Sequence, residues 1–141
     1  MRRPRRVNFE FKDGKYQPRL LEEHVLREIV DRLWYQARIK MFRIRERIPG
    51  KGQLSTPGLP DLIGWVPNSV MLTRSSTSGP IMCACPLPLY IEVKRPGGAR
   101  RPAQTQFIEE VKAGGCAAFF AESWSDVCRE LAKFGINLKE D

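Results

Sequence analysis

The sequence predicts a single α/β domain with a mixed central sheet flanked by helices, in the order α-β-β-β-α-β-α. Three observations support this fold class. The chain has 141 residues, the size of one compact domain, and 42% of them are apolar, enough for a core. Segments with helical periodicity alternate with segments typical of strands. A strand-helix-strand crossover over residues 89–121 predicts at least one pair of parallel strands.

Residues 1–18 are expected to form a basic N-terminal arm, because they are rich in arginine, contain Pro4, Gly14 and Pro18, and show little periodicity. The domain itself is assigned to residues 19–141. Its first helix is predicted over residues 19–40, where apolar side chains recur every three or four positions. Residues 41–48 alternate apolar and charged side chains, the pattern of a half-buried strand, and residues 49–52 interrupt it.

The middle of the chain is divided by proline and glycine. Residues 53–60 read as a loop, and residues 62–66 as a short buried strand. Residues 67–86 are rich in proline, serine and threonine, and we expect a long inserted loop that is partly extended. Residues 89–94 form a clear strand, which a proline and two glycines end.

The C-terminal part of the sequence predicts a helix, a strand and a helix. Pro102 suits the first turn of a helix that the glycine pair 114–115 ends. Residues 116–121 are apolar throughout, as in a fully buried strand. Ser123 or Ser125 then caps the last helix.

The excess of positive over negative charge is confined to the first third of the chain. The whole chain has 24 basic and 16 acidic side chains, a net charge of +8. Residues 1–51 hold 15 basic and 7 acidic side chains, residues 52–90 one of each, and residues 91–141 eight of each. Such an excess indicates a polyanionic partner, nucleic acid first and an anionic membrane surface second.

The composition also excludes several chemistries. His24 is the only histidine, which excludes a metal site with two histidines. The sequence has neither a phosphate-binding P-loop nor a G-x-G-x-x-G loop, so we expect no nucleotide cofactor. The four cysteines lack the paired spacing of structural zinc sites and are expected to be reduced thiols. No apolar run approaches the ~18 residues of a membrane span, and no signal peptide follows the basic start.

Three charged residues can carry chemistry. Glu92 and Lys94 lie two apart on one strand and so share a face. If strand 62–66 is its neighbour, Asp61 comes close to Glu92. Two adjacent carboxylates repel, and a divalent cation between them relieves that repulsion. Oxygen ligands suit Mg²⁺ or Mn²⁺, and Lys94 could then orient or deprotonate a water that attacks a phosphodiester.

The Glu-x-Lys pattern is weak by itself. Its alternative interpretation is a solvated salt bridge on an outer strand face. The chain contains a second copy, Glu110-Val111-Lys112, but this copy lies in a predicted helix, where residues two apart diverge. It cannot form the same site.

The surrounding motifs are more specific together than alone. They are Gly58-Leu59-Pro60-Asp61, Glu92-Val93-Lys94, the helix-opening Gln104 and the glycine pair 114–115. Together they resemble the VRR-NUC family, the virus-type replication-repair branch of the PD-(D/E)xK nuclease superfamily, over roughly residues 20–127. The inserted loop at residues 67–86 departs from the shorter hairpin expected there.

The resemblance implies a phosphodiesterase with a restriction-endonuclease-like core. Asp61 and Glu92 would hold the metal with the carbonyl of Val93. Lys94 would position the attacking water, and Gln104 would support Lys94 or that water.

Family members also place a glutamate near the start of the first helix. Here Glu22 and Glu23 compete. The sequence favours Glu23, because Leu26, Val30 and Leu33 follow it on the core side. The alternative for either residue is an ordinary acid in a first helical turn.

DNA contacts are expected from arginine and lysine side chains. On a strand over residues 41–48, alternate arginines share one face beside the loop that leads to Asp61. The alternative is a merely solvated strand face. The candidates are Arg43, Arg45, Arg47 and Lys51, with Arg100 and Arg101 as a second group.

The sequence and the resemblance together predict a Mg²⁺- or Mn²⁺-dependent, structure-specific DNA endonuclease. Similar stand-alone domains resemble viral or phage enzymes of DNA repair that cut four-way (Holliday) junctions as homodimers. The expected location is the cytoplasm of a bacterial or virus-infected cell, without membrane association. The alternatives are a non-catalytic nucleic-acid-binding module of a repair or packaging assembly, a flap or nicking nuclease, and an RNA-directed nuclease.

Overall fold

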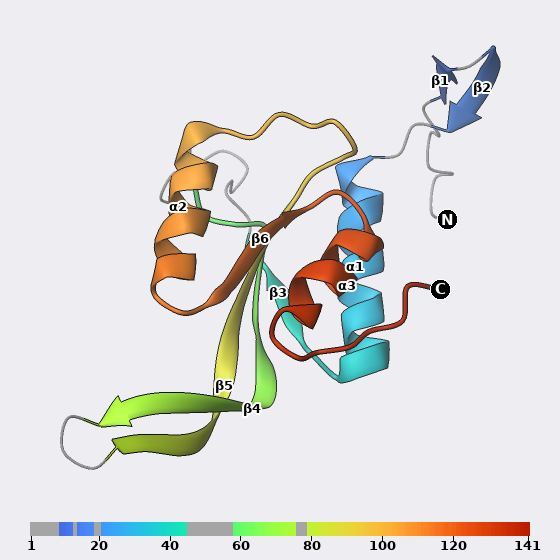
Figure 1. Cartoon of the computed structure of the whole chain (residues 1–141). Coiled ribbons are helices and arrows are strands. Elements are labelled where there is room, and N and C mark those ends of the chain that lie inside the picture. Colours follow the sequence, from blue (N-terminus) through green and yellow to red (C-terminus); the bar gives the residue numbers. More distant parts are fainter. Residues whose placement is uncertain (1–8, 13, 19–20, 45–57, 76–78) are drawn as a thin grey trace.

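The computed structural model describes residues 9–12, 14–18, 21–44, 58–75 and 79–141 (Figure 1). From the first helix onward, the predicted order α-β-β-β-α-β-α is confirmed. The elements are β1 (Phe9–Lys12), β2 (Lys15–Pro18), α1 (Glu22–Ala37), β3 (Met41–Arg43), β4 (Leu62–Ser75), β5 (Gly79–Val93), α2 (Pro102–Ala113), β6 (Ala117–Ala121) and α3 (Trp124–Ala132). Within the arm expected over residues 1–18, the described residues contain β1 and β2, which pair as an antiparallel hairpin.

The central sheet is mixed, as predicted, with the strand order β3-β4-β5-β6. β3 pairs antiparallel with β4, and β4 pairs antiparallel with β5. β5 and β6 are parallel, which the crossover through α2 requires. Leu62 is paired with Ile91, so the strands that carry Asp61 and Glu92 are neighbours.

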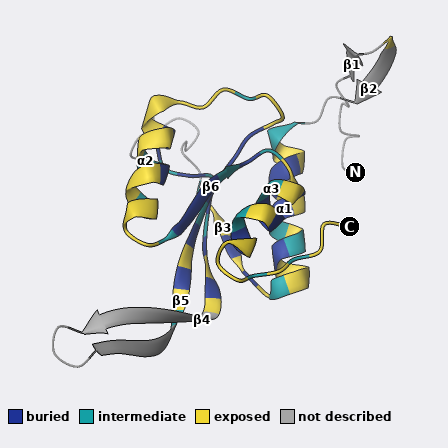
Figure 2. Ribbon diagram, in the orientation of Figure 1, coloured by how far each residue is buried: buried dark blue, intermediate teal, exposed yellow. Residues whose placement is uncertain are grey.

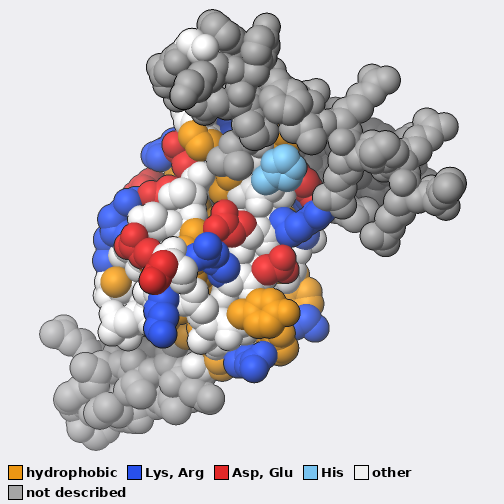
Figure 3. All heavy atoms as spheres, turned by 90° about the vertical axis from the view of Figure 1, so that its right-hand side faces the viewer, with side chains coloured by type: hydrophobic (Ala, Val, Ile, Leu, Met, Phe, Trp, Pro, Cys, Tyr) orange, Lys and Arg blue, Asp and Glu red, His pale blue; other side chains and the backbone are white. Residues whose placement is uncertain are grey.

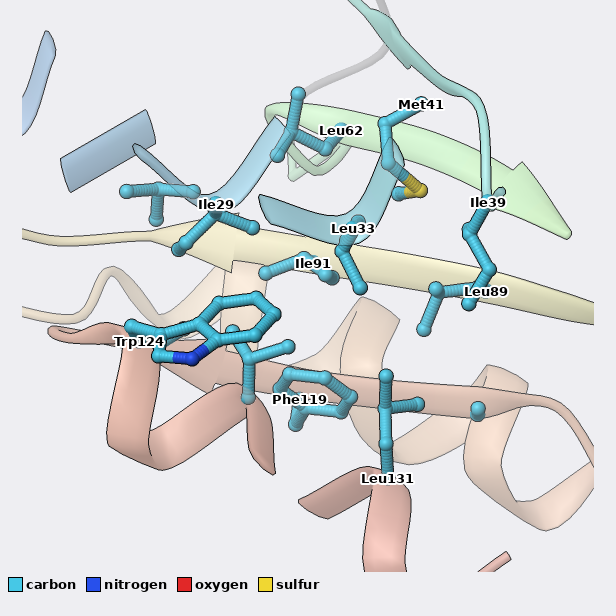
Figure 4. Packing of buried hydrophobic residues seen from close by; sticks show 14 of the residues in the cluster. Ile29, Leu33, Ile39, Met41, Leu62, Leu89, Ile91, Phe119, Trp124 and Leu131 are labelled. Atoms are coloured by element: carbon cyan, nitrogen blue, oxygen red, sulfur yellow. The ribbon is translucent and has the colours of Figure 1, made fainter. Parts of the chain in front are cut away.

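The sheet separates two layers of helices, with α1 and α3 on one face and α2 on the other (Figures 1 and 2). Alternate side chains of β5, among them Leu89 and Ile91, are fully buried against Ile29, Leu33 and Leu131 from the α1–α3 layer (Figure 4). Their neighbours on β5 therefore face α2. Within the described part of the chain, the helices lack the combination of length and apolarity that crossing a membrane requires.

The helix ends follow local chemistry. α1 stops at Ala37, before the predicted residue 40, because Arg38 adopts a left-handed conformation with φ 55° and its N–H bonds back to Leu33 and Trp34. α2 begins at Pro102 and is followed by the glycine pair, as predicted. Of the two serines considered as caps for α3, Ser123 is the one whose hydroxyl accepts from the N–H of Asp126, at 3.3 Å.

The segment over residues 67–86 differs most from its expectation. Instead of a long loop, the strands β4 and β5 continue through it, paired from Ser69 with Cys85 to Ser75 with Gly79. The register shifts between Val66 and Ser69, where Pro67 lacks a backbone donor. The paired strands project beyond the helices (Figure 1).

The strand predicted over residues 41–48 is shorter among the described residues. β3 covers Met41–Arg43, and the N–H of Ile44 extends the pairing by donating to the carbonyl of Asp61 at 2.8 Å. Arg45, Arg47 and Lys51 lie outside the described residues. The alternation predicted for this segment is therefore tested only at its start.

Candidate active site

Asp61, Glu92, Lys94 and Gln104 come together where β4 begins and β5 ends. A carboxylate oxygen of Asp61, Oδ2, accepts a hydrogen bond from the backbone N–H of Val93 at 2.8 Å. Glu92 and Lys94 point the same way, as the alternation predicted, and Lys94 Nζ lies 2.6 Å from Glu92 Oε1. Gln104, in the first turn of α2, donates from Nε2 to the same Oε1.

The two carboxylate oxygens of the buried Glu92 side chain have different hydrogen bonding. Only 1% of the residue is exposed, and Oε1 accepts from both Lys94 and Gln104. The second oxygen, Oε2, is buried and has no hydrogen-bond partner. A buried charged oxygen without a partner is costly, and native proteins usually satisfy such atoms. Oε2 is therefore the one buried side-chain atom in the described residues that calls for a ligand.

The environment of Glu92 raises the pKa of its carboxyl group from 4.5 to about 7. Burial is the largest cause, because it disfavours the charged form. The hydrogen bond from Lys94 lowers the pKa, whereas the negative charges of Asp61 and Glu22 raise it further. A cation near Glu92 would therefore stabilise the charged form of its carboxyl group, which burial disfavours.

The loop before Asp61 is packed tightly against α2. Gly58 has φ +93°, and a Cβ built there would lie 2.5 Å from the carbonyl oxygen of Ala103. Only glycine combines that backbone conformation with that close approach. The contact connects the loop that leads to Asp61 with the helical turn that carries Gln104.

The oxygen atoms available in the site are of the type that binds a hard divalent cation. Asp61 and Glu92 offer carboxylate oxygens, which Mg²⁺ and Mn²⁺ prefer, and Glu92 Oε2 is the orphaned buried atom. The described side chains include no cluster of three or more His, Cys, Asp or Glu residues placed to hold a metal. The side chain of Val93, the remaining expected ligand, is buried in the core, and its backbone N–H donates to Asp61.

The two candidate glutamates at the start of α1 have different surroundings. Glu23 is exposed and forms ion pairs with Arg43 at 2.8 Å and with Arg27 at 3.7 Å. Glu22 is half-buried, and its charge contributes to the raised pKa of Glu92. The charge of Glu22 thus has a small effect on Glu92, while Glu23, which the sequence favoured, is ion-paired with arginines.

The expected DNA-binding arginines are separated by the sheet. Arg43 is paired with Leu62 and so lies on the α1 side, opposite Glu92 and Lys94. Arg101 precedes α2, where its backbone N–H donates to Gln104 Oε1 at 3.2 Å. Arg100 lies over the ring of Phe120, 4.6 Å from its centroid, and Phe120 is paired with Glu92. Arg100 and Arg101 thus lie on the active-site side.

The face seen in Figure 3 carries basic and acidic side chains in alternation rather than one continuous basic surface. Ion pairs also occur along α1, such as Arg32 with Glu28 at 3.1 Å. His24 is exposed on the same face and takes no part in the site. The described side chains on this face therefore do not by themselves form a basic surface.

Sequence reasoning missed a pair of exposed aromatic side chains. The rings of Phe42 and Trp65 are stacked with centroids 5.7 Å apart and an interplanar angle of 24°. The available signal was the spacing of Asp61, Ile63 and Trp65, which places all three on one side of β4.

Comparison with known proteins identifies the family of the chain. No curated protein and no solved structure gives a significant match. The family model of the VRR-NUC domain matches residues 5–124, which is most of the chain and includes every residue of the site. The fold is that of the PD-(D/E)xK nucleases. The chain therefore belongs to the VRR-NUC family and carries a nuclease-type domain.

Proposed function

We propose that the protein is a Mg²⁺- or Mn²⁺-dependent DNA endonuclease that hydrolyses phosphodiester bonds. The observation that carries the proposal is the orphaned Oε2 of Glu92, buried beside Asp61 while Lys94 and Gln104 hold the other oxygen. A structural salt bridge would satisfy both oxygens or expose them to water. An oxygen that is fixed and unsatisfied is suited to a cation.

Each residue has a distinct task in this mechanism. Asp61 and Glu92 hold the cation, with the carbonyl of Val93 as a further ligand. A bound divalent cation would stabilise negative charge on the phosphate and make water more acidic. Lys94, fixed 2.6 Å from Glu92, supplies a positive charge that orients the attacking water or the phosphate. Gln104 donates to Glu92, so we assign it the positioning of Glu92, beside the support of Lys94 or of the water that the resemblance implied.

The test is metal-dependent cleavage by purified protein of labelled four-way junction, flap and plain duplex DNA. We expect Asp61→Asn and Lys94→Ala to abolish cutting while DNA binding is retained. The control is Lys112→Ala, which removes the lysine of the second Glu-x-Lys triplet. Lys112 is about half exposed on α2 and its partner is Glu109 at 3.7 Å. Cutting by Lys94→Ala at the rate of Lys112→Ala would overturn the proposal, and binding without any cutting would favour the non-catalytic module.

Of the two glutamates at the start of α1, we propose that Glu22, rather than Glu23, acts on the bound metal through its charge, because the described residues form no cluster of three acidic side chains that could hold the metal directly. The support for this proposal is the effect of the Glu22 charge on Glu92 and the engagement of Glu23 with Arg43. Glu22→Gln should therefore raise the Mn²⁺ concentration needed for half-maximal cutting, and Glu23→Gln should leave it within about twofold. The reverse order would restore Glu23 as the ligand.

The substrate we propose is branched DNA, with four-way junctions first and flaps second. This preference and a homodimer follow from the family resemblance. The described residues form one candidate site per chain, and two symmetric cuts require two sites related by a two-fold axis. A mass measurement in solution combined with junction cleavage tests both points, because a monomer that only nicks its substrates would exclude junction resolution.

A further inference from the structure

The face of the sheet that carries the candidate active site continues past it as an aromatic surface. Phe42 is paired with Ile63, and both share the face of Trp65. Their neighbours along the strands, Leu62 and Met41, point instead into the core. Asp61 precedes Ile63 and Trp65 with the same two-residue spacing, so the aromatic pair lies on the active-site side.

Helix α2 covers only part of this face. Phe107 of α2 packs edge-on against Tyr90 of β5, with ring centroids 5.7 Å apart. Towards β3, Phe42 and Trp65 remain 45% and 47% exposed, and no described helix lies over them. Two large rings stacked on each other and open to solvent form a flat apolar surface rather than isolated exposed residues.

A positive charge lies next to the two rings. Lys40 Nζ is 5.2 Å from the centroid of the Phe42 ring. Aromatic rings that bind bases, together with a cation that binds phosphate, are the chemistry with which proteins hold single-stranded nucleic acid. Trp65 follows Asp61 by four residues on an extended strand, or about 13 Å, a distance that a few nucleotides of a DNA strand can span.

We propose that Phe42 and Trp65 form a stacking platform for unpaired bases of the DNA strand bound at the active site, and that Lys40 contacts an adjoining phosphate. The inference rests on the proposed function and refines its substrate: among branched DNAs it favours flaps, which carry unpaired nucleotides beside the bond that is cut, over fully paired junctions. A second copy of the chain fits this surface poorly, because a two-fold interface would bring Lys40 and its copy together, and two rings bury far less than a stable dimer needs.

The experiment compares two labelled DNAs in chelator, a duplex with a single-stranded oligothymidine flap and the same duplex with blunt ends. Trp65→Ala should weaken binding to the flap DNA by about tenfold and change binding to the blunt duplex by less than about twofold. Trp65→Phe retains a ring and should keep most of the affinity. Oligothymidine should quench tryptophan fluorescence in the wild type, and less in Trp65→Phe.

The matched control is Trp34→Ala. Trp34 is 46% exposed and has Arg38 over its ring at 5.4 Å, but it lies on α1, on the other side of the sheet. It should bind both DNAs like the wild type. Lys40→Ala should lower the slope of log affinity against log salt by about 0.7. This variant also tests the proposal if Trp65→Ala fails to fold by circular dichroism.

Two results would overturn the inference: equal weakening of flap and blunt binding in Trp65→Ala, or a wild-type dimer that Trp65→Ala converts to monomers. The proposed function has a separate test. If the wild type cuts no DNA with Mn²⁺ but Trp65→Ala still loses flap binding, the platform stands and the nuclease activity does not. If the wild type cuts and Trp65→Ala binds flap DNA normally, the activity stands and the platform does not.

Discussion

The burial of Glu92 should make the stability of the metal-free protein depend on pH. Its pKa is about 7 in the folded protein, against an ordinary value of 4.5 that applies to the unfolded chain. Because the folded state holds the proton more tightly, this contribution to stability is fully present below about pH 4.5 and is lost as the pH rises through 7. The difference between the two pKa values corresponds to about 3 kcal/mol, of which about 2.5 kcal/mol is lost between about pH 5 and pH 8.

The perturbation that isolates this effect is Glu92→Gln, which keeps the shape of the side chain and removes its titration. Urea unfolding followed by circular dichroism, in chelator, should show the wild type losing about 2.5 kcal/mol more than the variant between about pH 5 and pH 8. Altered hydrogen bonds to Lys94 and Gln104 shift the stability at all pH values and leave this difference unchanged. Among the described residues, the pKa of Asp126 is lowered from 3.8 and that of Cys128 raised from 9.0, so both titrate outside this range.

A bound cation should then reverse the loss. Mn²⁺ at about a hundred times its dissociation constant should stabilise the wild type at about pH 8 by roughly 2.7 kcal/mol, and Glu92→Gln much less. Parallel pH profiles for the wild type and the variant would show that burial does not govern Glu92. Equal stabilisation of both proteins by Mn²⁺ would show that Glu92 does not hold the metal.

Three further predictions concern the surroundings of the site. In single-turnover kinetics, Gln104→Ala should lower the cleavage rate by about tenfold, because Glu92 loses a hydrogen bond of about 1.4 kcal/mol. The control is Gln106→Ala, on the exposed side of α2, which should leave that rate unchanged. Gly58→Ala should lower the free energy of unfolding by about 2 kcal/mol or more, since its Cβ would meet the Ala103 carbonyl at 2.5 Å; unchanged urea unfolding would contradict this. Arg100→Ala should reduce the salt dependence of duplex binding by a slope of about 0.9, as measured by anisotropy; an unchanged slope would exclude a phosphate contact.

The sequence by itself determined the elements whose signals are local. Leu89 and Ile91 alternate with Glu92 along β5, and that period of two is a property of the extended backbone. It therefore predicted both the buried face and the pairing of Glu92 with Lys94. Pro102 and the glycine pair set the ends of α2 through their own backbone preferences. The motifs around Asp61 were sufficient to indicate the family that the comparison shows.

Only the tertiary structure decided which side chains meet across elements. Glu22 and Glu23 are adjacent in sequence. Because β3 lies beside α1, Glu23 forms an ion pair with Arg43, whereas the charge of Glu22 raises the pKa of Glu92. The stacking of Phe42 on Trp65 likewise depends on the register between β3 and β4.

The segment over residues 67–86 shows the same limit. Its composition reads as a loop, but backbone hydrogen bonds between β4 and β5 make it a hairpin. Strands pair through backbone N–H and C=O groups, which every residue type except proline has. The composition of a segment therefore says little about which residues its strands pair with. Local periodicity thus indicated which residues are candidates for the site, and the long-range register of the strands determined which of them lie close together.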